Sequence, residues 1–174
     1  MKKLILTLLL CFLVAISFGQ TQRKISLYLS GEYTETLYDR TRLNNPWSAG
    51  LGVQGFLNNT SKFKPTIDIT ATVFLMHFNI LYLDESGKPL DGADGMVNAF
   101  AGVSYHPTKI IYASLVGGPS FINGETHFGI KPSFGVYFSR KQKLTAKVSY
   151  LNVFNRINSE DLGAINISLG VKLF

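Results

Sequence analysis

Apolar and polar residues alternate along most of the chain, with the period of two that is typical of strands having two different faces. In residues 65–73, isoleucine, alanine and valine fall on one face, whereas threonine and Asp68 fall on the other. Residues 128–138 and 165–173 show the same alternation. Weaker alternation predicts further strands around 25–30, 49–54, 97–104, 110–118 and 144–149. The pattern predicts an all-β protein of eight strands, and residues 110–118 are apolar on both faces, so their sides stay unassigned.

The connections between these strands alternate in length. Three are short, namely 58–62, 106–109 and 139–143. Four are longer or more polar, namely 35–45, 77–95, 119–125 and 155–161. Transmembrane barrels show this rhythm of short periplasmic turns and longer outer loops. An even number of strands then places both chain ends on the short-turn side.

Charge follows the same division. Ten of the eleven acidic residues lie in or beside the four long loops, Glu32 among them, and only Asp68 lies in the middle of a strand. The short turns and their edges instead carry Lys62, Lys64, Lys109, Arg140, Lys141 and Lys143. Because the strand assignment did not use charge, this asymmetry supports it independently.

The first residues predict a secretory signal peptide, residues 1–19. Lys2 and Lys3 precede an apolar or small stretch, residues 4–18, that is too short to span a bilayer, and Ser17-Phe18-Gly19 has the small residues of a cleavage site. Cleavage before Gln20 would leave one domain, residues 20–174, without cysteine, because Cys11 is the only one. The formal charge of +6 then falls to +4, since Lys2 and Lys3 are lost. Export argues against a nucleic-acid partner.

Alternation alone does not say which face points outward, because a soluble barrel reverses the faces of a membrane barrel. Charged residues in the middle of the polar face and aromatic residues near strand ends favour the membrane barrel. The aromatic residues expected to form interfacial belts are Trp47, Phe56, Phe63, Phe74, Tyr105, Phe138, Tyr150 and Phe154. The interior of an eight-stranded barrel is filled by side chains, so we expect Asp68 to pair there with Lys131, Lys147 and Lys172. A ten-stranded barrel with an extra hairpin at 74–83 stays an alternative.

The chain offers little chemistry. The three histidines, His77, His106 and His127, have no metal-binding spacing, and none begins a His-x-Ser pair. His127 with Ser133 and Glu125 could be imagined as a triad, but nothing singles these residues out. The acidic, glycine-rich residues 84–95 lack the spacing of a calcium loop and are interpreted as a solvated turn. We expect no catalytic, cofactor-binding or metal-binding residues and no enzymatic activity.

The signal peptide ending Ser17-Phe18-Gly19-Gln20, the eight segments and the closing residues 170–174 (GVKLF) resemble the small outer-membrane β-barrel proteins of Bacteroidota-type bacteria. These are similar in architecture to the OmpX and OmpA barrel domains. The resemblance implies a single antiparallel up-and-down transmembrane barrel in the outer membrane. It also implies insertion by the barrel-assembly machinery through the C-terminal strand ending at Phe174. In one departure, Lys172, Gly170 and Ser168 share parity with Phe174 where the family places apolar residues.

A barrel of this kind can serve several functions, because the fold does not determine the activity. We expect a structural or surface-interaction role in outer-membrane lipid, as a monomer, and no general porin activity. The alternatives are a small solute or ion channel, a surface lipid-modifying enzyme, and a soluble periplasmic barrel that binds an apolar ligand.

Overall fold

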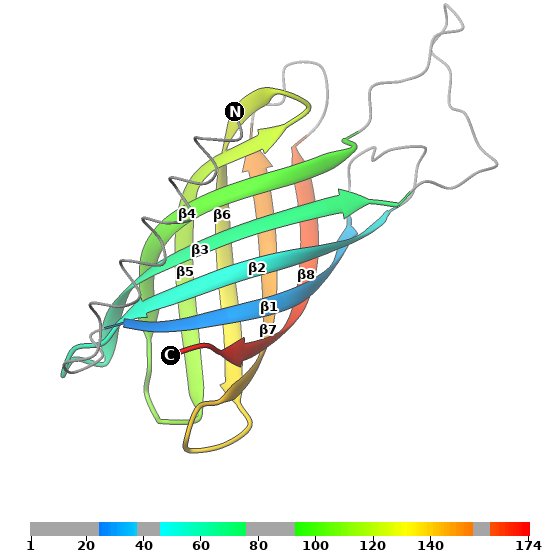
Figure 1. The fold of residues 1–174 in the computed structure, drawn as a ribbon. Coiled ribbons are helices and arrows are strands. Elements are labelled where there is room, and N and C mark those ends of the chain that lie inside the picture. Colours follow the sequence, from blue (N-terminus) through cyan, green and yellow to red (C-terminus); the bar gives the residue numbers. More distant parts are fainter. Residues whose placement is uncertain (1–24, 38–45, 76–92, 155–160) are drawn as a thin grey trace, which may run out of the picture.

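Eight antiparallel strands close into one barrel. The structure is a computed structural model that describes residues 25–37, 46–75, 93–154 and 161–174. Its strands are β1 (Ile25–Thr36), β2 (Trp47–Leu57), β3 (Phe63–Phe74), β4 (Gly95–Tyr105), β5 (Ile111–Ile122), β6 (Glu125–Tyr137), β7 (Leu144–Phe154) and β8 (Leu162–Lys172). Each strand pairs with its neighbours in the sequence, and β1 pairs with β8 from Tyr28 opposite Lys172 to Thr36 opposite Ala164. Figure 1 shows the resulting tilted, closed cylinder.

The apolar face of each strand points outward. Leu51, Leu115 and Leu169 lie near the middle of three strands and are 65%, 61% and 63% exposed. No charged side chain of the described residues points outward in this middle band, because each lies either inside the barrel or near a strand end. An exterior of this kind suits lipid, whereas a soluble barrel that binds an apolar ligand needs the reverse arrangement.

The polar face of each strand lines the interior, as the alternation predicts. Thr66, Thr70 and Asn98 are almost completely buried. They bond across strands: the Thr66 and Ser104 hydroxyls lie 2.6 Å apart, and the Asn98 amide donates to the Thr70 hydroxyl at 3.0 Å. The strand that the sequence left unassigned, β5, follows the same rule, with Tyr112, Ser114 and Val116 turned inward.

The belt prediction is right for some aromatic residues and wrong for two. Trp47, Phe63, Tyr105 and Phe138 are exposed on the outside near strand ends, whereas Tyr150 is exposed near the middle of β7. The prediction fails for Phe56 and Phe74, which are only 2% exposed and lie inside the barrel. They share strand parity with inward-facing Gln54 and Thr72, so the alternation itself could have placed them.

The short turns form at the expected places, but one of the four long loops does not exist. Strand β5 continues to Ile122 and β6 already begins at Glu125, so only Asn123 and Gly124 connect them. Their φ angles of 50° and 84° are those of a type I′ turn, which Asn-Gly favours because both positions need positive φ. The proline at 119, which suggested a loop, sits in β5.

The structure also decides between eight and ten strands. Strand β3 pairs directly with β4, with Val73 opposite Gly95, so no extra hairpin lies between them. The predicted signal peptide, His77 and most of the acidic, glycine-rich segment lie outside the described residues. Within the described residues, no helix has the length and apolar character needed to cross a membrane.

Candidate functional site in the barrel interior

A cluster of four charged side chains lies at the centre of the barrel. Asp68 of β3 contacts Lys147 of β7 at 2.6 Å and Lys131 of β6 at 3.1 Å, and both lysines donate hydrogen bonds to it. Glu32 of β1 lies 3.6 Å from the Lys131 amine and 4.0 Å from the Lys147 amine. All four side chains are at most 3% exposed. Two carboxylates and two ammonium groups make the cluster neutral, which is what allows charge to be buried.

The predicted ion cluster is therefore right for three residues and wrong for the fourth. Asp68, Lys131 and Lys147 meet as expected. Lys172 lies at the end of β8 and is half-buried, so Glu32 takes the expected fourth place. The sequence predicts Glu32 to lie beside a loop, because the clear alternation of the first strand ends at Ser30. In the structure β1 continues to Thr36, and Glu32 keeps the inward parity of Ser30 and Tyr28.

An aromatic layer fills the barrel at the short-turn end. It consists of Tyr28, Phe56, Tyr112, Tyr137 and His106, whose neighbouring ring centroids lie 5.0 to 6.2 Å apart. Hydrogen bonds fix two of the rings, since the Tyr28 hydroxyl donates to the Gln142 carbonyl at 3.0 Å and the Tyr112 hydroxyl to the Gln54 side chain at 3.2 Å. The alternation did not predict this layer, although Tyr28, Phe56 and Tyr137 have the parity of the polar face.

A third layer, made of apolar side chains, fills the loop end. Most of its fully buried members lie toward the loop ends of five strands or just before β4. Phe100 and Val116 instead lie near the middle of β4 and β5, opposite Asp68 and Lys131 in the neighbouring strands. They are Phe74, Ala93, Met96, Phe100, Val116, Ile122, Leu151, Val153, Leu162 and Ala164. The described part of the interior is thus closed by an apolar layer, a charged layer and an aromatic layer in succession.

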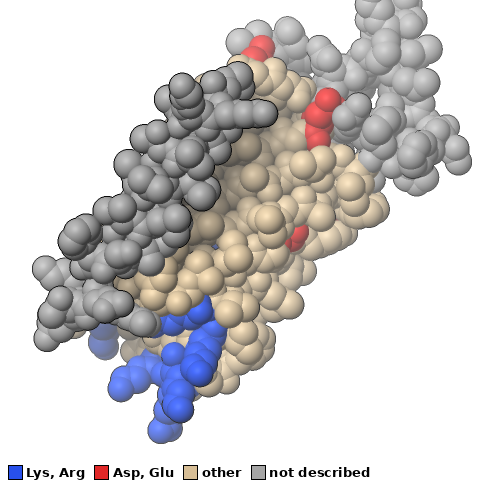
Figure 2. Space-filling model, viewed as in Figure 1, with Lys and Arg blue, Asp and Glu red and all other residues tan. Residues whose placement is uncertain are grey.

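The two ends of the barrel carry opposite charge. The short-turn end bears Lys62, Lys64, Lys109, Arg140, Lys141, Lys143 and Lys172, whereas no acidic side chain of the described residues lies there. The described acidic residues outside the central cluster, Glu35, Asp94, Glu125 and Asp161, lie at the loop end. Figure 2 shows blue side chains gathered at the lower end of the barrel and red ones mostly toward the upper end.

A pocket opens among the short turns. Its volume is ≈ 270 Å³, and it is lined by the β2–β3 turn, the β4–β5 turn, Lys64 and Gln142. His106 lies in this pocket with its ring stacked on Tyr112 at 5.4 Å, and its two ring nitrogens are buried without a hydrogen-bond partner. Burial, and secondarily the charge of Lys64, lowers the pKa of His106 from 6.5 to about 4. The imidazole is therefore neutral at pH 7.

His127, Ser133 and Glu125 do not come together as a catalytic triad. His127 contacts Glu125 at 3.4 Å, but Ser133 is six residues further along the same strand. At a rise of about 3.3 Å per residue, the two lie roughly 20 Å apart. The Ser133 hydroxyl instead donates to the Lys131 carbonyl at 3.5 Å. Among the described residues, no three histidine, cysteine or acidic side chains gather in a way that could hold a metal ion.

Comparison by sequence gives no relative, because no family model and no curated protein matches the chain. Solved structures do share its fold. The attachment invasion locus protein Ail of Yersinia pestis is 9% identical, with a TM-score of 0.59 over 86% of this chain and 97% of Ail. Neisserial surface protein A is 10% identical, with a TM-score of 0.54 over 86% of this chain and 96% of its own.

A transmembrane β-barrel designed de novo is similar to the same degree, at 11% identity and a TM-score of 0.51 over 85% of this chain and 95% of the design. Such low identities establish the fold alone. None of these comparisons bears on the Bacteroidota-type origin that the sequence resemblance implies. Taken with the apolar exterior, they identify the chain as a small, closed, up-and-down transmembrane β-barrel.

Proposed function

We propose that this protein resides in the bacterial outer membrane and has a structural or surface-interaction role there. Its exterior is an apolar band bounded by exposed aromatic residues such as Trp47 and Phe63, as expected for a barrel in lipid. The similar solved structures include Ail, the attachment invasion locus protein of Yersinia pestis. That description supports a surface role for this chain without naming its partner.

The filled interior is the observation that carries this proposal. A porin needs a water-filled lumen, but here three successive layers of side chains occupy the cylinder. We expect the refolded protein to give no stepwise conductance in planar lipid bilayers under conditions in which a general porin does. Reproducible conductance steps would instead support the alternative of a small solute or ion channel, provided that the protein is shown to be folded by its mobility shift on boiling in SDS gels.

The orientation of the barrel in the membrane can be tested with introduced single cysteines. The one native cysteine, Cys11, lies in the predicted signal peptide, so the mature protein would have no other thiol. Glu125→Cys places a thiol at the loop end, where Glu125 is exposed, and Lys141→Cys places one at the short-turn end. We expect a membrane-impermeant maleimide to label the first variant but not the second on intact cells, and both after lysis.

Labelling of both variants only after cells release their periplasm, with the protein in the released fraction, would favour the soluble periplasmic alternative. Labelling of the Lys141→Cys variant alone would mean that the basic end faces outward, which would reverse the proposed orientation.

The role of Phe174 in recognition by the assembly machinery belongs to the same proposal. It predicts less folded barrel in the outer membrane when Phe174 is deleted.

A further inference from the structure

We propose that the pocket at the short-turn end binds a phosphate group, held by Lys62, Lys64 and Lys109 above the ring of His106. The pocket is not used by the proposed structural role, since it lies outside the charged layer and at the end opposite the acidic loops. The ligand is defined by its chemistry. It is a phosphate carried by a lipid headgroup or a phosphate free in solution.

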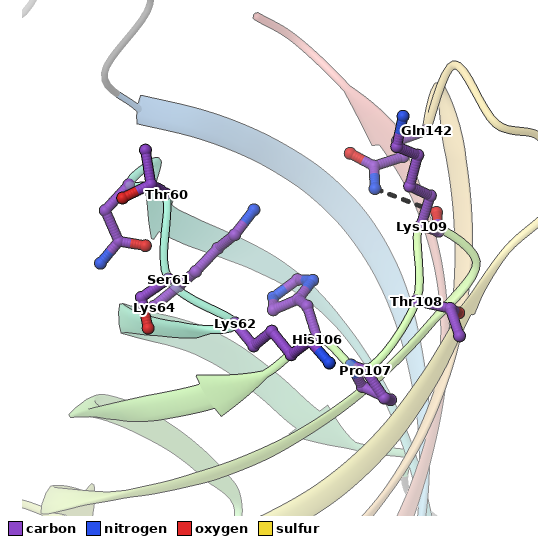
Figure 3. A pocket seen from close by; sticks show the side chains of 10 residues that line it. Thr60, Ser61, Lys62, Lys64, His106, Pro107, Thr108, Lys109 and Gln142 are labelled. Atoms are coloured by element: carbon purple, nitrogen blue, oxygen red, sulfur yellow. Dashed lines mark hydrogen bonds between the residues drawn. The ribbon is translucent and has the colours of Figure 1, made fainter.

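Charge is the first reason. Three lysines from two turns and from the start of β3 line one pocket of ≈ 270 Å³. Figure 3 shows Lys64 reaching into the same space as His106, with the Lys109–Gln142 pair on the other side. Among the residues that the structure describes, no acidic side chain lines the pocket to neutralise these cations. Gathering like charges without a counter-ion is unfavourable, and an anion would relieve the repulsion.

The unpartnered histidine is the second, independent reason. His106 is only 8% exposed, and both of its ring nitrogens lack a hydrogen-bond partner among the described residues. A buried polar group without a partner costs free energy, so such groups are rare and call for an explanation. One imidazole N–H aimed at a phosphate oxygen in the pocket would satisfy this ring.

The pocket walls are fixed before any ligand binds. The Gln142 side chain donates to the Lys109 carbonyl at 3.0 Å, and the Gln142 carbonyl accepts from the Tyr28 hydroxyl at 3.0 Å. The His106 amide donates to the Lys62 carbonyl at 2.8 Å, which joins the β2–β3 and β4–β5 turns. Because the turns are held together in this way, binding of an anion would require ordering of the lysine side chains but not of the turn backbone.

The pKa of His106 can report on phosphate binding, because it depends on the groups around the ring. The groups facing its ring are the cations Lys62, Lys64 and Lys109 and the rings of Phe56, Tyr112 and Tyr137. With no anion present, burial and Lys64 hold the His106 pKa at about 4. A bound phosphate would favour the protonated ring and raise that pKa.

The experiment follows imidazole signals by NMR in refolded protein labelled at histidine, in a zwitterionic detergent and a phosphate-free buffer. Inorganic phosphate is titrated in one arm. In the other arm, bilayers of phosphatidylglycerol replace bilayers of phosphatidylcholine. We expect at least one arm to raise the midpoint of His106 by about one pH unit or more. The ring signals of His127, at the opposite end, serve as an internal control and should not respond to added phosphate.

Variants separate the pocket from the basic end as a whole. Lys64→Gln should weaken binding about tenfold, as expected for the loss of one charge-assisted contact. Lys141→Gln removes the same charge from the same end outside the pocket and should leave binding within about twofold of the parent. Each variant is first shown to migrate as a folded barrel on unheated SDS gels, so that misfolding is not mistaken for lost binding.

The two arms identify the source of the phosphate. A response to free phosphate supports a soluble ligand, whereas a response to phosphatidylglycerol alone supports a lipid headgroup. Absence of any His106 response in both arms would overturn the proposal. An equal loss in Lys64→Gln and Lys141→Gln would also overturn it, because binding would then be spread over the basic end.

Discussion

At the scale of single residues, the centre of the barrel depends on Asp68. This carboxylate contacts both buried lysines at 3.1 and 2.6 Å, whereas Glu32 lies at 3.6 and 4.0 Å and accepts no hydrogen bond from them. The neutrality of the cluster therefore rests on Asp68 more than on Glu32. An uncompensated lysine in this water-poor interior would be costly.

Asp68→Asn tests this dependence. The substitution keeps the shape of the side chain but leaves two buried ammonium groups facing one carboxylate. We expect the free energy of unfolding to fall by about 3–5 kcal/mol. Denaturant titration in lipid vesicles, followed by the fluorescence of the single tryptophan, Trp47, measures it.

Glu35→Gln is the matched control, because it also removes one negative charge, but from a side chain that is exposed at the loop end of β1. It should change the free energy of unfolding by less than about 1 kcal/mol. Equal effects of the two substitutions would mean that the central cluster contributes nothing particular to stability.

Gly135 is a second residue on which packing depends. Its Cα faces the ring of Tyr112, and an added Cβ would overlap atoms of that ring. Gly135→Ala should therefore lower the free energy of unfolding by about 1–3 kcal/mol, the usual cost of overpacking. Gly31→Ala is the control, since nothing lies within 4 Å of the Cβ it would add. A destabilisation by Gly31→Ala as large as that by Gly135→Ala would contradict this packing.

At the scale of the strand, alternation of apolar and polar residues predicted most of the fold. It predicted eight strands, and the charged and aromatic residues then favoured an outward apolar face for every strand except the unassigned β5, because one face must be apolar in lipid and the other must fill a narrow lumen. It failed where strands run on beyond the clear pattern. The extension of β1 brought in Glu32, and the extension of β5 and β6 removed a predicted loop. The Asn123-Gly124 pair was the signal that could have corrected the second error.

The interior layers could not be predicted in the same way. Parity says that a side chain points inward but not at what height, because height depends on strand tilt and register. Glu32 and Lys131 meet only after β1 has paired with β8, and Phe56 and His106 meet only after β2, β3 and β4 have paired. The pocket among the short turns likewise combines segments far apart in the sequence, which no local pattern joins.

The outward face of β7 provides a test at this scale. Val148 points outward near the middle of the strand and is 52% exposed, so we expect Val148→Arg to cost about 2–4 kcal/mol in lipid. Ile110 is 47% exposed but lies in the β4–β5 turn, where Ile110→Arg should cost about 0–1 kcal/mol. The same unfolding titration in vesicles compares them. Equal, small costs at both positions would place the middle of β7 outside the hydrocarbon.

At the scale of the whole molecule, three properties follow from one arrangement. The apolar exterior suits lipid, and the filled interior excludes a wide pore. The opposite charges of the two ends make the acidic loop end electrostatically different from the basic short-turn end. In the proposed orientation the acidic end would face partners at the cell surface, and the basic end holds the pocket proposed to bind phosphate. Each property depends on the polar face pointing inward.

Heat-modifiability tests that central claim most directly. The refolded protein is run on SDS gels with and without boiling, and its solubility without detergent is measured in parallel. We predict a clear mobility shift on boiling and aggregation without detergent, because a closed barrel with an apolar exterior resists SDS until heated. A protein that shows no shift and remains soluble without detergent would contradict the account, because its polar face would then point outward.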